Sequence, residues 1–310
     1  MITKVFIDGS AGTTGLRINE RLSARKDIEL IKLTEENRKD VNARKTAINL
    51  ADVVFLCLPD AAAIESVSLV ENEKTVIIDT STAHRTNPQF VYGFPELTGQ
   101  REKIAAAKRI ANPGCHASGF VALIEPLIKN GLIKSDINLN CFSITGYSGG
   151  GKKMIADYEN EANKASLLAP RQYGITQNHK HLPEMAKICG LENAPIFCPI
   201  VSSFYSGMEV TVPLFAKDLK GSVCDIKELY KSYYKSGLVK FVEADTEGGL
   251  LSAAKLSGRD DMEISVFGND DRILLVSRFD NLGKGASGAA IQNMNISLGV
   301  DETTGLNIGE

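Results

Sequence analysis

The chain has 310 residues, of which 43% are hydrophobic and 24% are charged, and its formal net charge is −3. That length allows one large core or, more readily, two domains. A slightly acidic chain has no overall positive field to hold nucleic acid or an anionic membrane surface. No apolar run reaches the roughly 18 residues that a membrane-spanning helix requires. We therefore expect a globular protein with neither a nucleic-acid nor a membrane partner.

Strands alternate with helices over the first 115 residues. Helical spacing of apolar residues occurs at 16–25 and 62–70. Short apolar runs, typical of parallel strands covered on both faces, lie at 2–8, 28–33, 53–58, 75–81 and 108–114, the last with its turn. This order predicts a Rossmann-type, doubly wound parallel sheet in a domain at 1–115.

The pattern changes after residue 115. Residues 116–131 predict a helix that Pro126 kinks or breaks and that Gly131 ends. Strand-like segments, several alternating in period two as antiparallel strands do, follow at 137–147, 194–204, 208–216, 238–244, 262–268 and 272–280. We expect an α+β catalytic domain with a largely antiparallel sheet at 116–284. A final helix at 285–299 opens a segment, 285–310, that is expected to pack back on the first domain.

The cysteine pattern bears on metal binding and on the cellular compartment. No two of the six cysteines form a CxxC pair, and their spacings fit neither a zinc ribbon nor a zinc finger. The first residues lack the charged start, apolar stretch and cleavage site of a signal peptide. The sequence therefore predicts free thiols, no metal site and a cytoplasmic location.

A glycine-rich turn joins the first strand to the first helix. Gly9, Gly12 and Gly15 stand at GxxGxxG spacing directly between the two elements. Residues without a Cβ let backbone N–H groups approach a pyrophosphate at a helix N-terminus. The strand before the turn and the helix after it favour dinucleotide binding over the alternative of a plain structural turn.

The end of the second strand bears on the choice between NAD and NADP. A basic side chain there accepts a 2′-phosphate, whereas an acidic one bonds the ribose 2′-hydroxyl. Arg38 and Lys39 favour NADP, and Ser10 in the first loop supports them. Glu35 and Glu36 favour NAD instead. A solvated polar loop is the alternative interpretation.

Cys115 follows the segment NPG and opens the helix at 116–131. A thiol at a helix start faces unpaired N–H groups and the positive end of the dipole, both of which stabilise the thiolate. A thiolate is the nucleophile that attacks an acyl phosphate or an aldehyde. A buried structural cysteine is the alternative, and it fits Cys57, Cys141 and Cys198 better than Cys115.

Two of the four histidines lie close together in QNHKHLPE. Leu182 precedes Pro183, so it is expected to be extended, with a helix from Pro183 that Gly190 ends. Residues two apart in an extended segment share a face, which places His179 beside His181. A helix start keeps an imidazole neutral, as a general base requires. Ordinary polar packing is the alternative; a metal site lacks a third ligand.

Seven motifs stand in order along the chain: GSAGTTG, DTSTAHR, YGFPEL, NPGCHASG, GYSGGGK, HKHLPE and DNLGKGASGAAIQN. With them the chain resembles the N-acetyl-gamma-glutamyl-phosphate reductases in their shorter, type 2 form. The matching motifs run from residue 9 to about 299, nearly the whole chain. The resemblance implies a fold like that of the glyceraldehyde-phosphate and semialdehyde dehydrogenases. Aspartate-semialdehyde dehydrogenases share the architecture and the cysteine but not this set of motifs.

The resemblance also implies residue roles. Cys115 matches the nucleophile and His181 the acid/base, with His179 as a neighbouring polar contact. Arg85 and Lys152 would lie near the substrate's phosphate or carboxylate, although Arg85 could instead cap a loop. Lys152 follows three glycines that suit a flexible lid or a solvated surface. The cofactor would contact Gly9, Ser10, Gly12, Thr13, Thr14, Gly15, Arg38, Leu58, Pro59, Ser81, Asn281, Gly288 and Gln292.

One departure from the family pattern is His116, where tyrosine is expected after the nucleophile. Its imidazole either alters the pKa of the Cys115 thiol or caps the helix. The implied activity is the NADP-dependent reductive dephosphorylation of N-acetyl-L-glutamyl 5-phosphate through a thioester, in arginine biosynthesis, by a homodimer or homotetramer. Another acyl-phosphate reductase, such as aspartate-semialdehyde dehydrogenase, and a non-catalytic NADP-binding protein are the alternatives.

Overall fold

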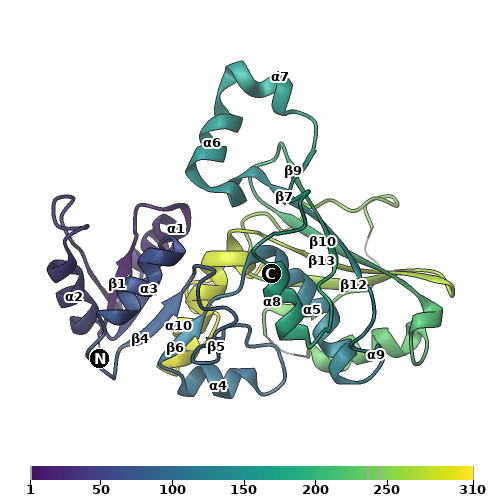
Figure 1. Ribbon diagram of the computed structural model, residues 1–310, viewed down its shortest axis with the longest axis horizontal. Helices are drawn as coiled ribbons and strands as arrows, with labels where there is room; N and C mark the ends of the chain where they lie inside the picture. The colour runs from purple at the N-terminus through teal and green to yellow at the C-terminus, as the bar shows by residue number, and fades with distance from the viewer. Residues whose placement is uncertain (1, 236, 244–245, 310) are drawn as a thin grey trace. The chain divides into compact units, whose positions relative to one another are not determined.

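The computed structural model describes residues 2–235, 237–243 and 246–309 (Figure 1). Contacts divide the chain into two compact units. The first comprises Met1–Pro113 and Ala286–Leu306, and the second comprises Gly114–Gly285 and Asn307–Glu310. The predicted segment 285–310 is therefore divided between the units. Asn307 belongs to the second, where its backbone N–H donates to the Asp260 carboxylate at 2.8 Å.

The first unit is built on a six-stranded, wholly parallel sheet in the order β2-β1-β3-β4-β6-β5. Its strands are β1 Thr3–Asp8, β2 Ile28–Ile31, β3 Val53–Leu56, β4 Val76–Asp79, β5 Val91–Tyr92 and β6 Arg109–Ala111. This confirms the doubly wound parallel sheet predicted from the alternation of strands and helices. The strand β6 lies within the predicted segment 108–114, whereas the two-residue strand β5 was not predicted.

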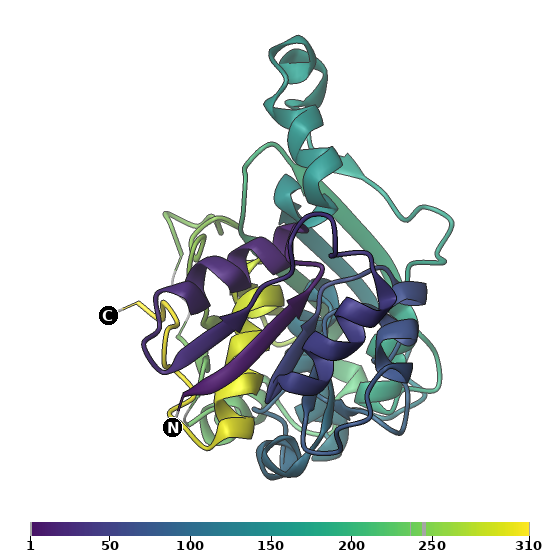
Figure 2. The same ribbon diagram turned by 90° about the vertical axis from the view of Figure 1, so that its left-hand side faces the viewer.

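Helices cover both faces of this sheet, because successive strand side chains alternate between two cores. They are α1 Thr13–Ser23, α2 Val41–Leu50, α3 Asp60–Ser68, α4 Gln100–Ala106 and α10 Gly288–Leu298. One core joins Val5 and Phe55 to Ile18 of α1 and Met294 of α10; the other joins Val54 and its neighbours to α2 and α3. Figure 2 shows α10, in yellow, against the strands of this unit. The C-terminal helix thus completes the core of the first unit.

The helix α2 was not expected from the apolar pattern. Five of its ten residues are polar, and Asp40 caps its start by accepting the Ala43 N–H at 2.7 Å. Its Arg44 is buried and bonds the Asp8 carboxylate at the end of β1, with nitrogen and oxygen 3.1 Å apart. A buried ion pair therefore adds to the packing of Ala47 and Ile48 in holding this helix against the sheet.

The second unit holds a seven-stranded sheet in the order β11-β12-β13-β10-β7-β9-β8. Its strands are β7 Asn140–Gly146, β8 Arg171–Gln172, β9 Ile196–Ser202, β10 Met208–Phe215, β11 Val239–Phe241, β12 Met262–Gly268 and β13 Arg272–Phe279. Four of the six pairings are antiparallel, while β7–β9 and β11–β12 are parallel. The sheet is thus largely antiparallel, as predicted. The last residue of the expected strand 238–244 lies outside the described residues.

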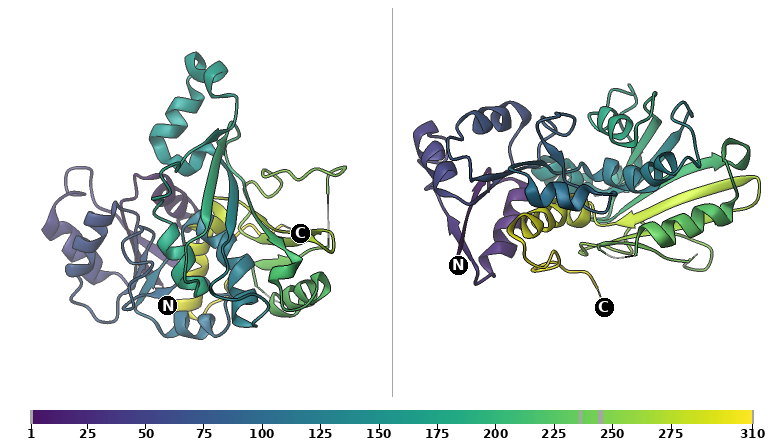
Figure 3. Two further views of the ribbon diagram at one scale, coloured as in Figure 1. Left: turned by 45° about the vertical axis from the view of Figure 1, so that its right-hand side comes forward. Right: turned by 90° about the horizontal axis from the view of Figure 1, so that it is seen from below.

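Helices α5 Cys115–Lys129, α8 Leu182–Cys189 and α9 Val223–Tyr233 belong to this unit, and α5 packs on β10 and β13. Two further helices, α6 Gly151–Glu159 and α7 Lys164–Leu167, form an arm beyond the ends of β7 and β9 (Figure 3). The three glycines expected to form a flexible loop instead lie in the 3₁₀ turn Tyr147–Gly150 and the first turn of α6. Tyr158 of α6 stacks on Tyr147, with ring centroids 4.8 Å apart, and this contact orders the arm.

Of the kink or break predicted at Pro126, the break is wrong, since α5 continues through it to Lys129. A proline lacks the N–H that would bond the carbonyl four residues earlier, here that of Ala122. The hydroxyl of Tyr234, at the C-terminal end of α9, donates to this carbonyl at 2.7 Å. A tertiary hydrogen bond thus replaces the missing one. Gly131 follows the helix with φ +72°, as expected of a terminating glycine.

The expectation that Leu182 is extended is also wrong. Leu182 begins α8, with Pro183 second and His181 as the N-cap. Pro183 is tolerated there because first-turn N–H groups have no partner within the helix. Burial of Leu182 and Met185 outweighs the local preference of a residue before proline. Gly190, at φ +70°, ends the helix as predicted.

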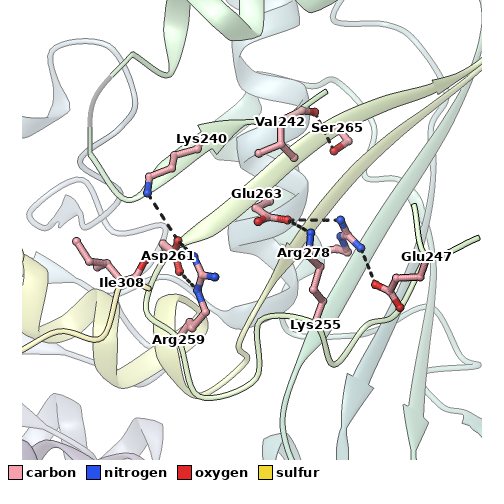
Figure 4. A network of polar contacts seen from close by, with 10 residues as sticks. All are labelled: Lys240, Val242, Glu247, Lys255, Arg259, Asp261, Glu263, Ser265, Arg278 and Ile308. Carbon is pink, nitrogen blue, oxygen red and sulfur yellow. Dashed lines mark hydrogen bonds and ion pairs between the residues drawn. The ribbon is translucent and has the colours of Figure 1, made fainter. Parts of the chain in front are cut away.

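A network of ion pairs crosses the second sheet (Figure 4). Arg278 is 2% exposed and lies 3.4 Å from the carboxylates of both Glu247 and Glu263. Lys255 adds a further bond to Glu263 at 3.1 Å. Arg278 therefore links β13 to β12 and to the loop that carries Glu247. Among the described residues, no helix has the length and apolar character needed to span a membrane.

Candidate active site

The glycine turn of the first unit has a shape that side chains would destroy. Gly9 has φ +89°, and a Cβ there would lie 2.3 Å from the carbonyl oxygen of Cys57. A Cβ on Gly15 would lie 2.5 Å from the carbonyl oxygen of Gly9. Gly12 is the N-cap of α1 and supplies no side-chain cap, so the first-turn N–H groups of the helix face outward. The turn is a cradle of backbone donors, which suits the pyrophosphate of a dinucleotide.

Other predicted cofactor residues follow the carboxyl ends of adjacent strands, where doubly wound sheets bind their ligands. Leu58 follows β3, and its side chain lies 3.0 Å from where a Cβ of Gly9 would be. Pro59 is the N-cap of α3. Ser81 follows β4 and donates to the Asp79 carboxylate at 2.8 Å. The parallel sheet thus brings these residues to the edge that carries the glycine turn.

The basic residues expected to select NADP lie on the surface after β2. Arg38 pairs with Glu35 at 3.0 Å, and its side chain is 45% exposed. Lys39 and Ser10 are exposed too. An exposed ion pair is worth at most about 1 kcal/mol, so Arg38 is available to a stronger anion.

Arg85 is buried in the first unit and bonds backbone. Its Nε donates to the Asn112 carbonyl at 3.0 Å and an Nη to the Thr80 carbonyl at 3.1 Å. These bonds tie the loop after β4 to the loop after β6. The loop-capping alternative therefore describes Arg85 better than a substrate contact.

Three further predicted cofactor residues occupy different units. Gly288 and Gln292 lie in α10 of the first unit, and the Gln292 amide donates to Glu96 at 2.9 Å and to Glu302 at 2.8 Å. Asn281 lies in the second unit, where it accepts the Gly207 N–H at 2.9 Å and donates to Ser148 at 3.0 Å. Both amides hold loops within their own unit.

Cys115 is the first residue of the 15-residue helix α5 in the second unit, and it is half-buried. Its N-cap, Gly114, offers no side-chain cap. The Gly114 N–H donates to the buried Glu184 carboxylate of α8 at 2.8 Å. A Cβ on Gly285 would lie 3.0 Å from that of Cys115, so glycine keeps space beside the thiol. The thiol therefore sits at a helix start that favours its thiolate form.

The structure confirms that His179 and His181 lie together, and adds a third imidazole. Their ring centroids are 4.8 Å apart, and His116 lies 5.5 Å from His181 and 5.7 Å from His179. Phe197 of β9 packs against His116 and His179. His181 is 4% exposed, and as the N-cap of α8 it meets the end of the dipole that disfavours imidazolium. A group suited to general acid–base work thus lies in the unit that carries Cys115.

His116 does not cap the helix. Its Nδ1 and Nε2 lie 2.7 Å from the Ser143 hydroxyl and 2.6 Å from the Tyr173 hydroxyl. Burial, and then the charges of His179 and Lys180, lower the pKa of His116 to about 3. Burial also raises the pKa of Tyr173, and the charge of Cys115 raises it further. His116 is therefore a neutral imidazole and Tyr173 a neutral phenol at physiological pH.

Lys152 was predicted to contact the substrate, and Cys57 and Cys141 were predicted to be structural. Lys152 is exposed in the first turn of α6. Burial raises the pKa of Cys57 to about 12 and also raises that of Cys141, which fits structural thiols. No group of three His, Cys, Asp or Glu side chains that could hold a metal ion occurs within the ranges that the structure describes.

Sequence reasoning missed three residues of this site. Glu184 stands in the quoted motif HKHLPE but received no role. Ser143 and Tyr173 carry no local signal, because only the pairing of β7, β8 and β9 places them near α5.

Two family models match the chain. Residues 4–107 match the NAD binding domain of semialdehyde dehydrogenases, and residues 115–281 match the semialdehyde dehydrogenase dimerisation domain. The fold is similar to aspartate semialdehyde dehydrogenase II of Vibrio cholerae, with a TM-score of 0.72 and 15% identity over 96% of this chain and 98% of that one.

Curated relatives are much closer in sequence. The chain is 44% identical to N-acetyl-gamma-glutamyl-phosphate reductase 2 of Nostoc sp., over 98% of this chain and 99% of that protein. It is 46% identical to N-acetyl-gamma-glutamyl-phosphate reductase of Brucella suis, over 96% of this chain and all (100%) of that protein. Since this identity extends over nearly the whole length and both domains match, the chain belongs to the N-acetyl-gamma-glutamyl-phosphate reductase family, within the semialdehyde dehydrogenases.

Proposed function

We propose that the protein reduces N-acetyl-L-glutamyl 5-phosphate to N-acetyl-L-glutamate 5-semialdehyde with NADPH, releasing phosphate, as a step of arginine biosynthesis in the cytoplasm. The observation that carries the proposal is the thiol of Cys115 at the uncapped start of α5, in the unit that holds the His179 and His181 pair. The names of the curated relatives support the substrate.

Cys115 supplies the nucleophile. Its thiolate attacks the acyl carbon, the carbon–oxygen bond to phosphate breaks, and a thioester of Cys115 forms. N–H groups at the start of α5, which has no side-chain cap, would bond the negative oxygen that develops on that carbon. When bound, NADPH supplies the hydride that reduces the thioester. Cys115 then leaves as thiolate, which frees the aldehyde.

His181 moves the proton that this sequence requires. The oxygen that becomes negative after hydride transfer can take a proton from an imidazolium, and it must return that proton as the carbon–sulfur bond breaks; an imidazole titrates in the range that both transfers need. His181 is buried and sits next to His179, whose Nδ1 accepts the His181 backbone N–H at 3.2 Å. His179 therefore orients the segment that presents His181. General acid–base catalysis of this kind contributes roughly 10²–10⁴-fold.

The cofactor proposal rests on the shape of the first unit. The cradle that a Cβ at Gly9 or Gly15 would fill fits a pyrophosphate, with Ser10, Gly12, Thr13 and Thr14 around it. We assign Leu58, Pro59 and Ser81 to the same ligand because they follow the neighbouring strands. Arg38 and Lys39 would meet a 2′-phosphate, which makes NADP the preferred cofactor.

We propose that Lys152 and His179 bind the anionic groups of the substrate. Lys152 is exposed at the start of α6. Asn281, Gly288 and Gln292 remain proposed on the nicotinamide side. Arg85 is proposed to act on the substrate only through the loops that it holds.

We propose that the protein is a homodimer or homotetramer assembled through the second sheet. One face of that sheet carries Phe142, Ile196 and Leu274, which are 45%, 59% and 40% exposed. Strand register places Phe142 opposite Thr211, and Leu274 opposite Pro213, on one face. Exposed apolar side chains gathered on a sheet face indicate an interface. Light scattering on a sizing column tests this, and a monomer would contradict it.

The activity is tested in the reverse direction. Purified protein is mixed with N-acetyl-L-glutamate 5-semialdehyde, phosphate and NADP⁺, and absorbance of the reduced nicotinamide is followed. Parallel reactions use aspartate semialdehyde as substrate and NAD⁺ as cofactor. We expect signal with the acetylated glutamate compound and NADP⁺. Signal only with aspartate semialdehyde would overturn the substrate; no signal with either would favour a non-catalytic NADP-binding protein.

A further inference from the structure

A buried ion pair lies directly before the glycine turn of the first unit. Asp8 is the last residue of β1 and is 3% exposed, and Gly9 follows it. Arg44 of α2 donates to the Asp8 carboxylate from Nε at 3.2 Å and from an Nη at 3.1 Å. We propose that Arg44 is a positioning residue for the cofactor: it holds and neutralises Asp8, so that the turn at Gly9 accepts the pyrophosphate of a dinucleotide. This inference rests on the proposed binding of NADP in that turn.

The period of the strand decides which way the Asp8 side chain points. Phe6 of β1 packs in the core that this sheet shares with α2 and α3, and Asp8, two residues later, lies on the same face. Arg44 reaches the carboxylate from α2, and the hydroxyl of Ser66 in α3 lies 2.9 Å from it. The carboxylate is therefore enclosed by donors of its own unit and joins the end of β1 to both helices.

The guanidinium of Arg44 divides its donors among three acceptors. Besides the bonds to Asp8, one Nη donates to Glu65 at 2.9 Å and the other to the Ser66 hydroxyl at 2.5 Å. The Glu65 side chain is half exposed, so water screens its charge, whereas the carboxylate of Asp8 is buried. A planar fork of donors suits this arrangement, which the single ammonium of a lysine cannot reproduce. Arg44 therefore both neutralises Asp8 and fixes its orientation.

Stability alone does not account for charges at this place. A buried ion pair adds little to stability in comparison with apolar side chains of the same volume, because both ions lose their hydration. Ala47 and Ile48 already pack α2 into the core. Removal of Arg44 alone would leave the Asp8 carboxylate buried without its cation, one residue before the turn. What the pair adds beyond packing is a neutral and rigid base for that turn.

Both the backbone and the charge of Asp8 act on the turn. The Asp8 carbonyl accepts the Cys57 N–H at 2.8 Å, and the Gly9 carbonyl accepts the Gly12 N–H at 3.0 Å. A Cβ on Gly9 would lie 2.3 Å from the Cys57 carbonyl oxygen, so the turn has little room to shift. Two like charges about 10 Å apart, at an effective dielectric constant of about 20, repel each other enough to weaken binding roughly tenfold. A carboxylate without its cation beside the turn would therefore disfavour an anionic ligand.

Calorimetry on the whole protein tests the inference with two ligands, NADP and adenosine 2′-monophosphate, of which only NADP has a pyrophosphate. Arg44→Met should raise the Kd of NADP about tenfold and leave that of adenosine 2′-monophosphate within about twofold of the wild-type value. Adding Asp8→Asn to Arg44→Met removes the uncompensated charge and should recover most of the affinity for NADP. Arg44→Lys keeps the cation, and it should bind NADP more tightly than Arg44→Met does. It also serves as the test variant if Arg44→Met does not fold.

A matched control is Arg25→Met, since Arg25 pairs with Asp27 at 2.5 Å and follows α1 at the end away from the turn. It should lower the thermal unfolding temperature and leave the Kd of NADP unchanged. Wild-type affinity for NADP in Arg44→Met, or an equal loss for both ligands, would overturn the inference and leave the proposed function standing. A wild-type protein that does not bind NADP would overturn both. The expected changes in Kd without any turnover would support the inference and reject the proposed reaction alone.

Discussion

Removing the Glu184 carboxylate should lower kcat, although Glu184 contacts the residue before Cys115 and is not a proposed catalytic group. Glu184 is 1% exposed, and its Oε1 accepts the N–H of Gly114, the residue that caps α5 before Cys115. Glu184→Ala leaves this buried N–H without its acceptor, which costs about 1–3 kcal/mol. The loop before Cys115 is then free to shift, and a displacement of about 1 Å at a reacting group can cost about 10²-fold in rate. Glu184→Gln keeps an oxygen at the same place and should recover most of both losses.

Urea unfolding followed by circular dichroism measures the stability change, and the reverse semialdehyde assay measures kcat. The matched control is Glu192→Ala, which removes an exposed carboxylate that accepts a hydrogen bond from Ser135 at 3.0 Å. It should change the free energy of unfolding by no more than about 0.5 kcal/mol, as is usual for surface positions. A Glu184→Ala protein with wild-type kcat would refute the reasoning, because the carboxylate would then not position Cys115.

Three further outcomes test the site. Cys115→Ala should abolish turnover while NADP binding, followed by calorimetry, stays close to that of the wild type; residual turnover would reject the covalent mechanism. His181→Asn should reduce kcat more than His179→Asn in the same assay, and the opposite order would exchange their roles. Gly9→Ala should destabilise the protein and weaken NADP binding, because its Cβ would lie 2.3 Å from a carbonyl oxygen. Gly12→Ala is the comparison, since its Cβ would meet its nearest atom at an ordinary 3.5 Å; equal thermal unfolding of the two variants would count against this steric argument.

The local sequence was enough to locate the glycine turn and the cysteine at a helix start that we propose as cofactor site and nucleophile. Gly9, Gly12 and Gly15 stand between a strand and a helix, and Cys115 stands at a helix start. Both depend on backbone geometry that a short segment sets by itself. The same reasoning recognised the parallel sheet of the first unit, because buried strands read as unbroken apolar runs. It did not predict α2, half of whose residues are polar and which a buried ion pair between Arg44 and Asp8 also holds in place.

The sequence also carried local preferences that the fold overrode. Proline at 126 argues for a broken helix, and proline at 183 argues for an extended Leu182. A hydroxyl from Tyr234, more than a hundred residues away in the chain, satisfies the carbonyl that Pro126 leaves open. Local preferences of about 1–3 kcal/mol are outweighed when burial and a tertiary hydrogen bond act together.

By itself, the sequence determined the two classes of domain, the glycine cradle, the cysteine and the neighbouring histidines, since each follows from contacts between residues close in the chain. Only the tertiary structure decided which distant residues contact the neighbours of Cys115. Glu184 reaches Gly114 across 70 positions, and Tyr173 reaches His116 across 57. Such pairs are joined by sheet order and helix packing, which no local pattern encodes. The position of Cys115 at a helix start was therefore predictable from the sequence, whereas the residues that hold the backbone around it became visible only in the fold.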